Sequence, residues 1–175
     1  MSGPASSSAA LPVAYLTLRI LTVANWLMGV AIVVLLVAMP TRQWIMSSLE
    51  LSPSPEADRV VMGLRTIAVI GLAVIPLNYV ILKRLLAMVE TVRAGDPFVS
   101  TNAYRLQTIA WVLLILQLLS IVIGAIAKRI STPEHPIHLS AGFSINGWLA
   151  VLLTFILARV FAEGTIMRED LAGMV

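Results

Sequence analysis

The sequence predicts an all-α integral membrane protein, a bundle of four transmembrane helices built as two helical hairpins. Composition is the first observation, since 59% of the 175 residues are hydrophobic and 12% are charged, against roughly 45–50% and 25% in soluble domains. The spacing of charge is the second. Four long stretches carry no charged side chain: residues 20–41, 66–82, 106–127 and 139–158. About 20 apolar residues in a helix cross the ~30 Å hydrocarbon core of a bilayer, so each stretch is long enough to span it.

The spans are expected to be helical because lipid offers the backbone no hydrogen-bond partners, which leaves only helices and closed barrels. Barrel strands alternate in polarity, and the run Val30–Val37 does not alternate. We expect a flexible N-terminus over residues 1–12 and one transmembrane domain over residues 13–175. The predicted spans are residues 17–40, 60–83, 105–128 and 140–160.

The second helix is expected to be longer than the membrane is thick. Ser54-Pro55 is typical of an N-cap followed by proline at the first helical position, and Gly95-Asp96-Pro97 is a stop signal. A helix between them would extend for about 60 Å, twice the hydrocarbon thickness. Pro76 lies within it and predicts a kink, because proline leaves the Leu72 carbonyl without its usual partner.

The fourth helix is likewise expected to continue past Arg159, so the second and fourth helices both extend into the cytoplasm. The two hairpins are similar at their entry ends, where Arg19-x-x-Thr22-Val23-Ala24 parallels Arg105-x-x-Thr108-Ile109-Ala110. This similarity predicts a pseudo-twofold repeat about an axis along the membrane normal. Chance similarity between two apolar segments is the alternative.

The distribution of charge predicts that both termini lie in the cytoplasm. With an even number of spans, the termini share one side of the membrane with the connection between the second and third helices. The basic residues of that side are Arg19, Lys83, Arg84, Arg93, Arg105, Arg159 and Arg168. The basic residues of the other side are Arg42, Arg59, Arg65, Lys128 and Arg129. The positive-inside rule favours the richer side as the cytoplasmic one.

The sequence predicts no enzyme, no cofactor and no metal site. Glu134, His135 and His138 form a cluster that could bind zinc or copper, but Pro136 intervenes and a fourth ligand is missing, so a solvated loop is expected. Neither histidine lies in a span, where the axial ligand of a membrane haem would be. Basic residues beside spans anchor helices, so direct nucleic-acid binding is not expected.

The notable polar side chains within or beside the spans are Asn25, Asn78, Gln107, Gln117 and Asn146. Interhelical hydrogen bonds, worth about 0.6 kcal/mol on average in membranes, are the simpler explanation for them. The alternative is that the three asparagines line a cavity beside the kink at Pro76, in a small permease or a protein that binds lipid or another small molecule.

Two segments beside the spans form motifs. One is Gly95-Asp96-Pro97-Phe98-x-x-x-Asn102-x-x-Arg105-Leu106, and the other is Phe161-x-x-Gly164-x-x-x-x-Glu169-Asp170-Leu171-x-x-x-Val175. With four spans in one short chain, the sequence resembles the bacterial membrane family known as domain of unknown function 2975. The sequence departs from the family at Ala162-Glu163, where a basic pair is common in relatives.

The resemblance implies a protein of the bacterial inner membrane that holds or modulates a cytoplasmic partner, because members are often encoded beside a small helix-turn-helix transcription regulator. The candidate partner-binding residues are Arg84, Arg93, Asp96, Phe98, Asn102, Arg105, Phe161, Gly164, Arg168, Glu169 and Asp170. A structural role is the alternative for part of this set, since Asp96, Ser100 and Asn102 could cap the third helix. Ion pairs are expected between Arg93 or Arg168 and Glu169 or Asp170.

Overall fold

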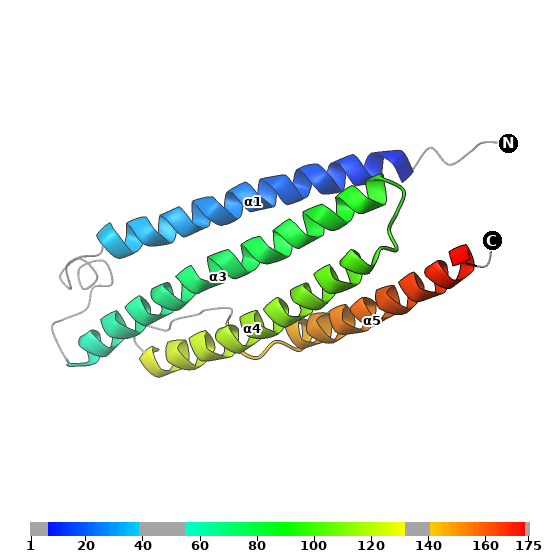
Figure 1. Cartoon of the computed structure of the whole chain (residues 1–175). Helices are drawn as coiled ribbons and strands as arrows, with labels where there is room; N and C mark the ends of the chain where they lie inside the picture. The colour runs from blue at the N-terminus through cyan, green and yellow to red at the C-terminus, as the bar shows by residue number, and fades with distance from the viewer. Residues whose placement is uncertain (1–6, 39–54, 132–140, 174–175) are drawn as a thin grey trace.

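A computed structural model of the chain describes residues 7–38, 55–131 and 141–173. They form four helices, α1 (Ser7–Ala38), α3 (Pro55–Arg93), α4 (Ser100–Ile130) and α5 (Ile145–Gly173), and no strand occurs among them (Figure 1). Each helix contains a segment long and apolar enough to cross a membrane: Ala10–Val37, Ala57–Arg93, Ser100–Ile130 and Ile145–Arg168. The predicted all-helical fold with four membrane spans is confirmed.

The helices lie side by side in chain order and form an open row (Figure 1). Close backbone contacts join α1 to α3, α3 to α4 and α4 to α5. Among the described residues, no two Cα atoms come within 8 Å of each other between helices that are not neighbours in this row. The helices therefore do not close into the expected bundle. Since α3 contacts α1 and α4 alike, the division into two hairpins stays a prediction.

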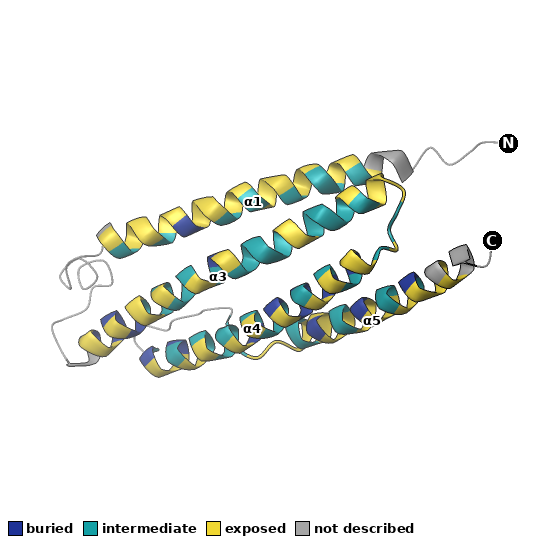
Figure 2. Ribbon diagram, in the orientation of Figure 1, coloured by how far each residue is buried: buried dark blue, intermediate teal, exposed yellow. Residues whose placement is uncertain are grey.

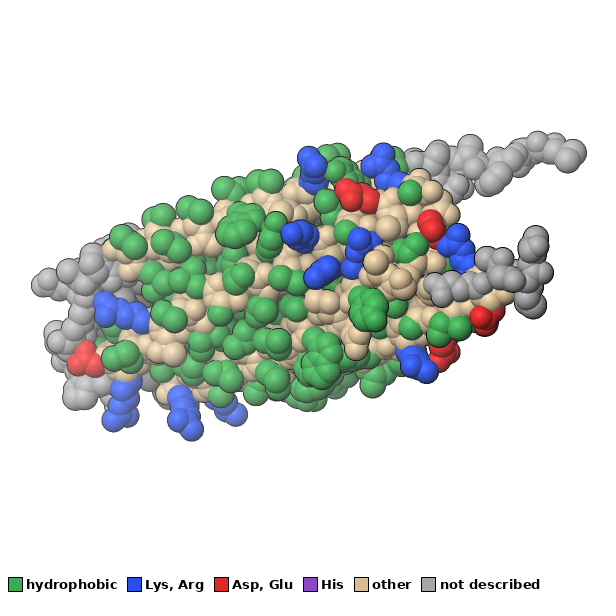
Figure 3. All heavy atoms as spheres, viewed as in Figure 1, with side chains coloured by type: hydrophobic (Ala, Val, Ile, Leu, Met, Phe, Trp, Pro, Cys, Tyr) green, Lys and Arg blue, Asp and Glu red, His purple; other side chains and the backbone are tan. Residues whose placement is uncertain are grey.

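Most of the helical surface is apolar and exposed, and burial is confined to the seams between neighbouring helices (Figure 2). The buried hydrophobic residues are Ala57, Val60, Val61, Ile75, Leu106, Ile109, Ala110, Val112, Ala127, Ile130, Val151 and Ala158. Figure 3 shows hydrophobic side chains across the middle of the molecule, with charged side chains toward both ends. A surface of this kind is stable in lipid, and the chain is a multi-pass membrane protein.

Small residues let the helices approach closely, as they commonly do in membranes. A Cβ atom added to Gly29 in α1 would lie 3.1 Å from Cγ2 of Ile75 in α3, and one added to Gly63 would lie 2.5 Å from Cγ2 of Ile130 in α4. Beside the first of these contacts, Nδ2 of Asn25 donates a hydrogen bond to the Ile75 carbonyl at 3.1 Å. The α1–α3 seam therefore combines close packing with an interhelical hydrogen bond.

The helix boundaries differ from the predicted ones in several places. α1 begins at Ser7 and so includes residues 7–12. In contrast, α3 is one helix that contains Pro76, as predicted. α5 begins at Ile145 rather than at residue 140, because the preceding segment is not helical and Gly142 has a φ of 136°. The hydroxyl of Ser120 in α4 holds that segment by accepting from the Gly142 N–H at 3.1 Å. The predicted N-cap at Ser54 lies outside the described residues, whereas Pro55 does begin α3.

Candidate functional site at the ends of α3, α4 and α5

The turn between α3 and α4 begins with a helix stop built on Gly95. Its φ of 81° is in the left-handed region, which glycine adopts without strain. The Gly95 N–H donates to the Val92 carbonyl at 3.1 Å, and the Asp96 N–H donates to the Thr91 carbonyl at 3.0 Å. This pair of hydrogen bonds is a Schellman motif, so the stop signal predicted from Gly95-Asp96-Pro97 is confirmed.

Asn102, in the first turn of α4, ties that turn to the end of α3. Its side-chain Nδ2 donates to the Thr91 hydroxyl at 2.7 Å and to the Pro97 carbonyl at 2.9 Å. Its Oδ1 accepts from Nη1 of Arg105 at 2.7 Å. Asn102 is completely buried, and every polar atom of its amide has a partner. A buried amide with all its hydrogen bonds made holds a single geometry.

Arg105 and Thr91 extend the same network into α3. Nη1 of Arg105 also donates to the Ala87 carbonyl at 3.1 Å, and the Thr91 hydroxyl donates to the Met88 carbonyl at 2.8 Å. The N-cap position of α4 is occupied by Val99, without a side-chain hydrogen bond. The capping role considered for Asp96, Ser100 and Asn102 is therefore wrong, and Asn102 instead joins two helices.

The last part of α5 packs against the turn through two aromatic rings. The ring centroids of Phe98 and Phe161 lie 5.3 Å apart with the planes tilted by 32°. One turn further along α5, a Cβ atom added to Gly164 would lie 3.2 Å from Cδ1 of Phe98. Thr165 beside it is buried, and its hydroxyl donates to the Phe161 carbonyl at 2.8 Å. The absence of a side chain at Gly164 thus gives the Phe98 ring its place.

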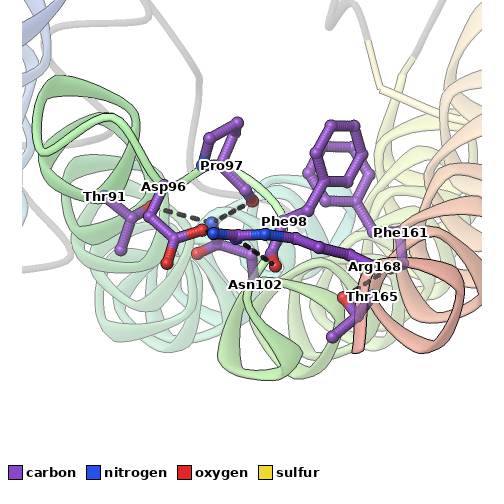
Figure 4. A network of polar contacts seen from close by, with 8 residues as sticks. All are labelled: Thr91, Asp96, Pro97, Phe98, Asn102, Phe161, Thr165 and Arg168. Carbon is purple, nitrogen blue, oxygen red and sulfur yellow. Dashed lines mark hydrogen bonds and ion pairs between the residues drawn. The ribbon is translucent and has the colours of Figure 1, made fainter. Parts of the chain in front are cut away.

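Arg168 completes the attachment of α5 to the turn (Figure 4). Its Nη1 forms an ion pair with Oδ1 of Asp96 and donates to the Phe98 carbonyl at 3.2 Å. Asp96, Phe98, Phe161, Gly164 and Arg168 are named the clasp below. The clasp joins the turn that follows α3 to the last part of α5. The residues that form its polar contacts are 70 or 72 positions apart in the sequence.

The structure brings most of the predicted partner-binding residues into one place. The clasp contains five of them, and the network beneath it contains Asn102 and Arg105. Arg168 pairs with Asp96, a residue of the α3–α4 turn. The guanidinium carbon of Arg93 lies 5.5 Å from the centroid of the Tyr15 ring, which Arg19 also covers at 5.1 Å.

Three further candidates lie outside the clasp and its network. Arg84 and Asp170 are exposed, and Glu169 lies within α5. Sequence reasoning did not select Thr91, Tyr15 or Pro97, although each contacts a selected residue. Only position in the sequence could have indicated two of them: Thr91 lies in the last turn of α3, and Pro97 follows the Gly95-Asp96 stop signal.

The other candidate sites are separate from the clasp. Glu134, His135 and His138 lie outside the described residues, and the described part of the chain contains no group of three potential metal ligands. Asn25 and Asn78 line one mostly apolar cleft of about 600 Å³, formed by α1 and α3 together with Ile123 of α4. Asn146 does not join them, since it is exposed at the first turn of α5.

Comparison with known proteins identifies a family without assigning an activity. No curated protein and no solved structure matches the chain. A family model described as a protein of unknown function, DUF2975, matches residues 45–174, a region that contains α3, α4, α5 and the whole clasp. The chain belongs to this family.

Proposed function

We propose that this protein is a non-enzymatic component of the bacterial cytoplasmic membrane that binds or modulates a cytoplasmic partner, a small helix-turn-helix transcription regulator. The clasp is the observation that carries the proposal. It attaches the last part of α5 to the α3–α4 turn, so that residues from distant parts of the chain form one surface at the ends of the helices.

The composition of this surface suits a basic protein partner. Phe98 is 43% exposed, and Asp170 and Glu163 are exposed acidic residues on α5. Acidic groups of this kind compete with phosphate for the basic face of a DNA-binding domain. A partner held here would be kept away from DNA for as long as the complex lasts.

The proposal requires the clasp to face the cytoplasm. The charge bias along the chain favours this orientation, with both termini on the same side. Single cysteines at Ser52 and Asp170 are suitable probes because the native chain contains no cysteine. An impermeant maleimide should label the first from outside the cell and the second only after lysis. Labelling of position 52 from the cytoplasm alone would contradict the orientation.

The direct test is co-purification with the regulator encoded beside the gene. Three chains are compared: the intact chain, one ending at Arg168 and one ending at Ala162. The first truncation removes Glu169 and Asp170 but retains the clasp, whereas the second removes Arg168 and Gly164 as well. We expect about tenfold lower recovery with the first, since lost charge contacts of about 1.4 kcal/mol change affinity by that factor, and no recovery with the second.

The matched control is Arg129→Gln, which changes an exposed charge at the opposite end of α4. Recovery of the regulator by this variant should equal that of the intact chain. Equal recovery by all three chains would show that the end of α5 is not needed to bind the regulator. No recovery by any of them would exclude the regulator as the partner.

Binding of a small apolar molecule between the spans is a second candidate function, and the cleft of Asn25 and Asn78 supports it. No hydrogen bond involves the Asn78 side chain among the described residues, so its amide is open to a ligand in the cleft. A photoreactive fatty acid should label α1 and α3, and Asn78→Leu should reduce that labelling. Labelling that is unchanged in the variant would contradict this candidate.

A further inference from the structure

A groove of about 460 Å³ runs between α4 and α5. Alanines form part of its wall, with Ala103 on α4 and Ala158 and Ala162 on α5. Their small side chains leave the space open where bulkier residues would fill it. Because both helices span the membrane, lipid molecules reach this groove directly.

The lining of the groove combines apolar and polar side chains. Phe155 and Ile166 are its large apolar residues, and the Phe155 ring meets the ring of Trp111 edge to face, with centroids 5.3 Å apart and planes at 89°. Its polar residues are Ser100, Tyr104, Gln107, Arg159 and Thr165. A lining of this kind suits a lipid, which brings an acyl chain and a headgroup to the same site.

Arg159, in the wall of the groove, forms an ion pair with Glu163, which is not itself a lining residue. Nε of Arg159 donates to Oε1 of Glu163 at 2.8 Å, one helical turn further along α5. This contact leaves both Nη atoms of Arg159 without a hydrogen bond among the described residues, and 77% of the side chain is exposed. The guanidinium can therefore bind a phosphate through its two Nη groups while Nε remains on the carboxylate.

We propose that this groove binds a phospholipid with a zwitterionic ethanolamine headgroup. The phosphodiester contacts Arg159 and the Tyr104 hydroxyl, and the ammonium group contacts Glu163. One acyl chain follows the alanine wall toward Phe155. The positive end of the α4 dipole at Ser100 adds to the attraction for phosphate. Since Arg159 and Glu163 together are neutral, a neutral headgroup with separated charges fits better than an anionic one.

Native mass spectrometry of the full chain in detergent tests the proposal. The protein is equilibrated with equal amounts of phosphatidylethanolamine and phosphatidylglycerol that carry the same acyl chains. The native chain should retain phosphatidylethanolamine about fivefold more than phosphatidylglycerol, as one charged contact predicts. Glu163→Gln should reverse that preference, because it removes the acceptor for ammonium and leaves Arg159 uncompensated.

Two further variants separate the headgroup contact from the groove. Arg159→Gln should lose both lipids, and Ala162→Leu should lose both by filling the groove while the charges stay in place. Lys83→Gln, which removes an exposed charge of α3 away from the groove, is the matched control and should behave like the native chain.

Several outcomes would overturn the proposal. Equal retention of the two lipids by the native chain would exclude the role of Glu163, and undiminished retention by Ala162→Leu would place the lipid elsewhere. Soluble phosphoethanolamine, which lacks acyl chains, should fail to displace the lipid. Displacement by it would indicate a site for free phosphate compounds rather than for lipid.

Discussion

The ring of Phe98, in the turn between α3 and α4, lies directly against Gly164 of α5, 3.2 Å from the place where a Cβ atom would stand. Gly164→Val should therefore displace Phe98 and weaken the clasp. We expect a loss of about 1–3 kcal/mol in the free energy of unfolding, the usual cost of overpacking. Unfolding in mixed detergent micelles measures this loss. Gly164→Ala should cost less, because the ring can yield by a few tenths of an ångström.

The buried amide of Asn102 predicts a large effect on stability. Asn102→Ala removes three hydrogen bonds and leaves the Pro97 carbonyl and the Arg105 guanidinium without that partner. The expected loss is about 3 kcal/mol in the free energy of unfolding, since unsatisfied buried groups cost about 1–3 kcal/mol each. The control is Asn146→Ala, at an exposed position, which should be nearly neutral. Similar losses in both variants would show that the network contributes little.

The ion pair between Asp96 and Arg168 should affect local order more than global stability. Both side chains are about half exposed, and exposed pairs are typically worth under about 1 kcal/mol. Arg168→Asp should accelerate amide hydrogen exchange over residues 163–173 with little change in melting temperature. The double variant with charges exchanged, Asp96→Arg and Arg168→Asp, should restore protection. Glu163→Gln, which breaks the other exposed pair of α5, should leave exchange in the α3–α4 turn unaltered.

At the opposite end of the molecule, the close packing around Gly124 predicts a second position where a larger side chain lowers stability. A Cβ atom added there would lie 2.7 Å from the Ala141 carbonyl oxygen and 2.7 Å from Cα of Gly142. Backbone atoms cannot move aside as a flexible side chain can, so Gly124→Ala should cost about 1–3 kcal/mol. Gly71→Ala is the matched control, since the nearest atom, Cδ1 of Ile32, lies at an ordinary 3.8 Å. A Gly71 variant as unstable as the Gly124 variant would contradict this explanation.

Much of the fold follows from the sequence through the physics of lipid. Long stretches without charge predicted four helices, because a backbone in hydrocarbon must satisfy its own hydrogen bonds. Gly95-Asp96-Pro97 predicted where α3 ends, since glycine accepts the left-handed conformation and proline cannot continue a helix. These features are local, and each depends on residues close together in the chain.

The same reasoning selected most of the residues around the clasp but not their partners. Arg168 was expected to pair with Glu169 or Asp170, near it in sequence, and its partner Asp96 in a distant segment was not foreseen. Asn102 was expected as a possible cap and instead joins α4 to Thr91 of α3. The residue types indicated that polar contacts form here. Which side chains meet depends on their distance in the folded structure, and the sequence does not give that distance.

What the sequence by itself determined is therefore the set of spans, the stop of α3 and the family to which the chain belongs. Only the tertiary structure decided that the helices form an open row, and that α5 meets the α3–α4 turn through Phe98 and Arg168. The physical reason is that apolar helices in lipid gain little from hydrophobicity when they pack together. Their arrangement depends instead on close contacts at glycine and on individual hydrogen bonds, which hydropathy and charge patterns do not encode.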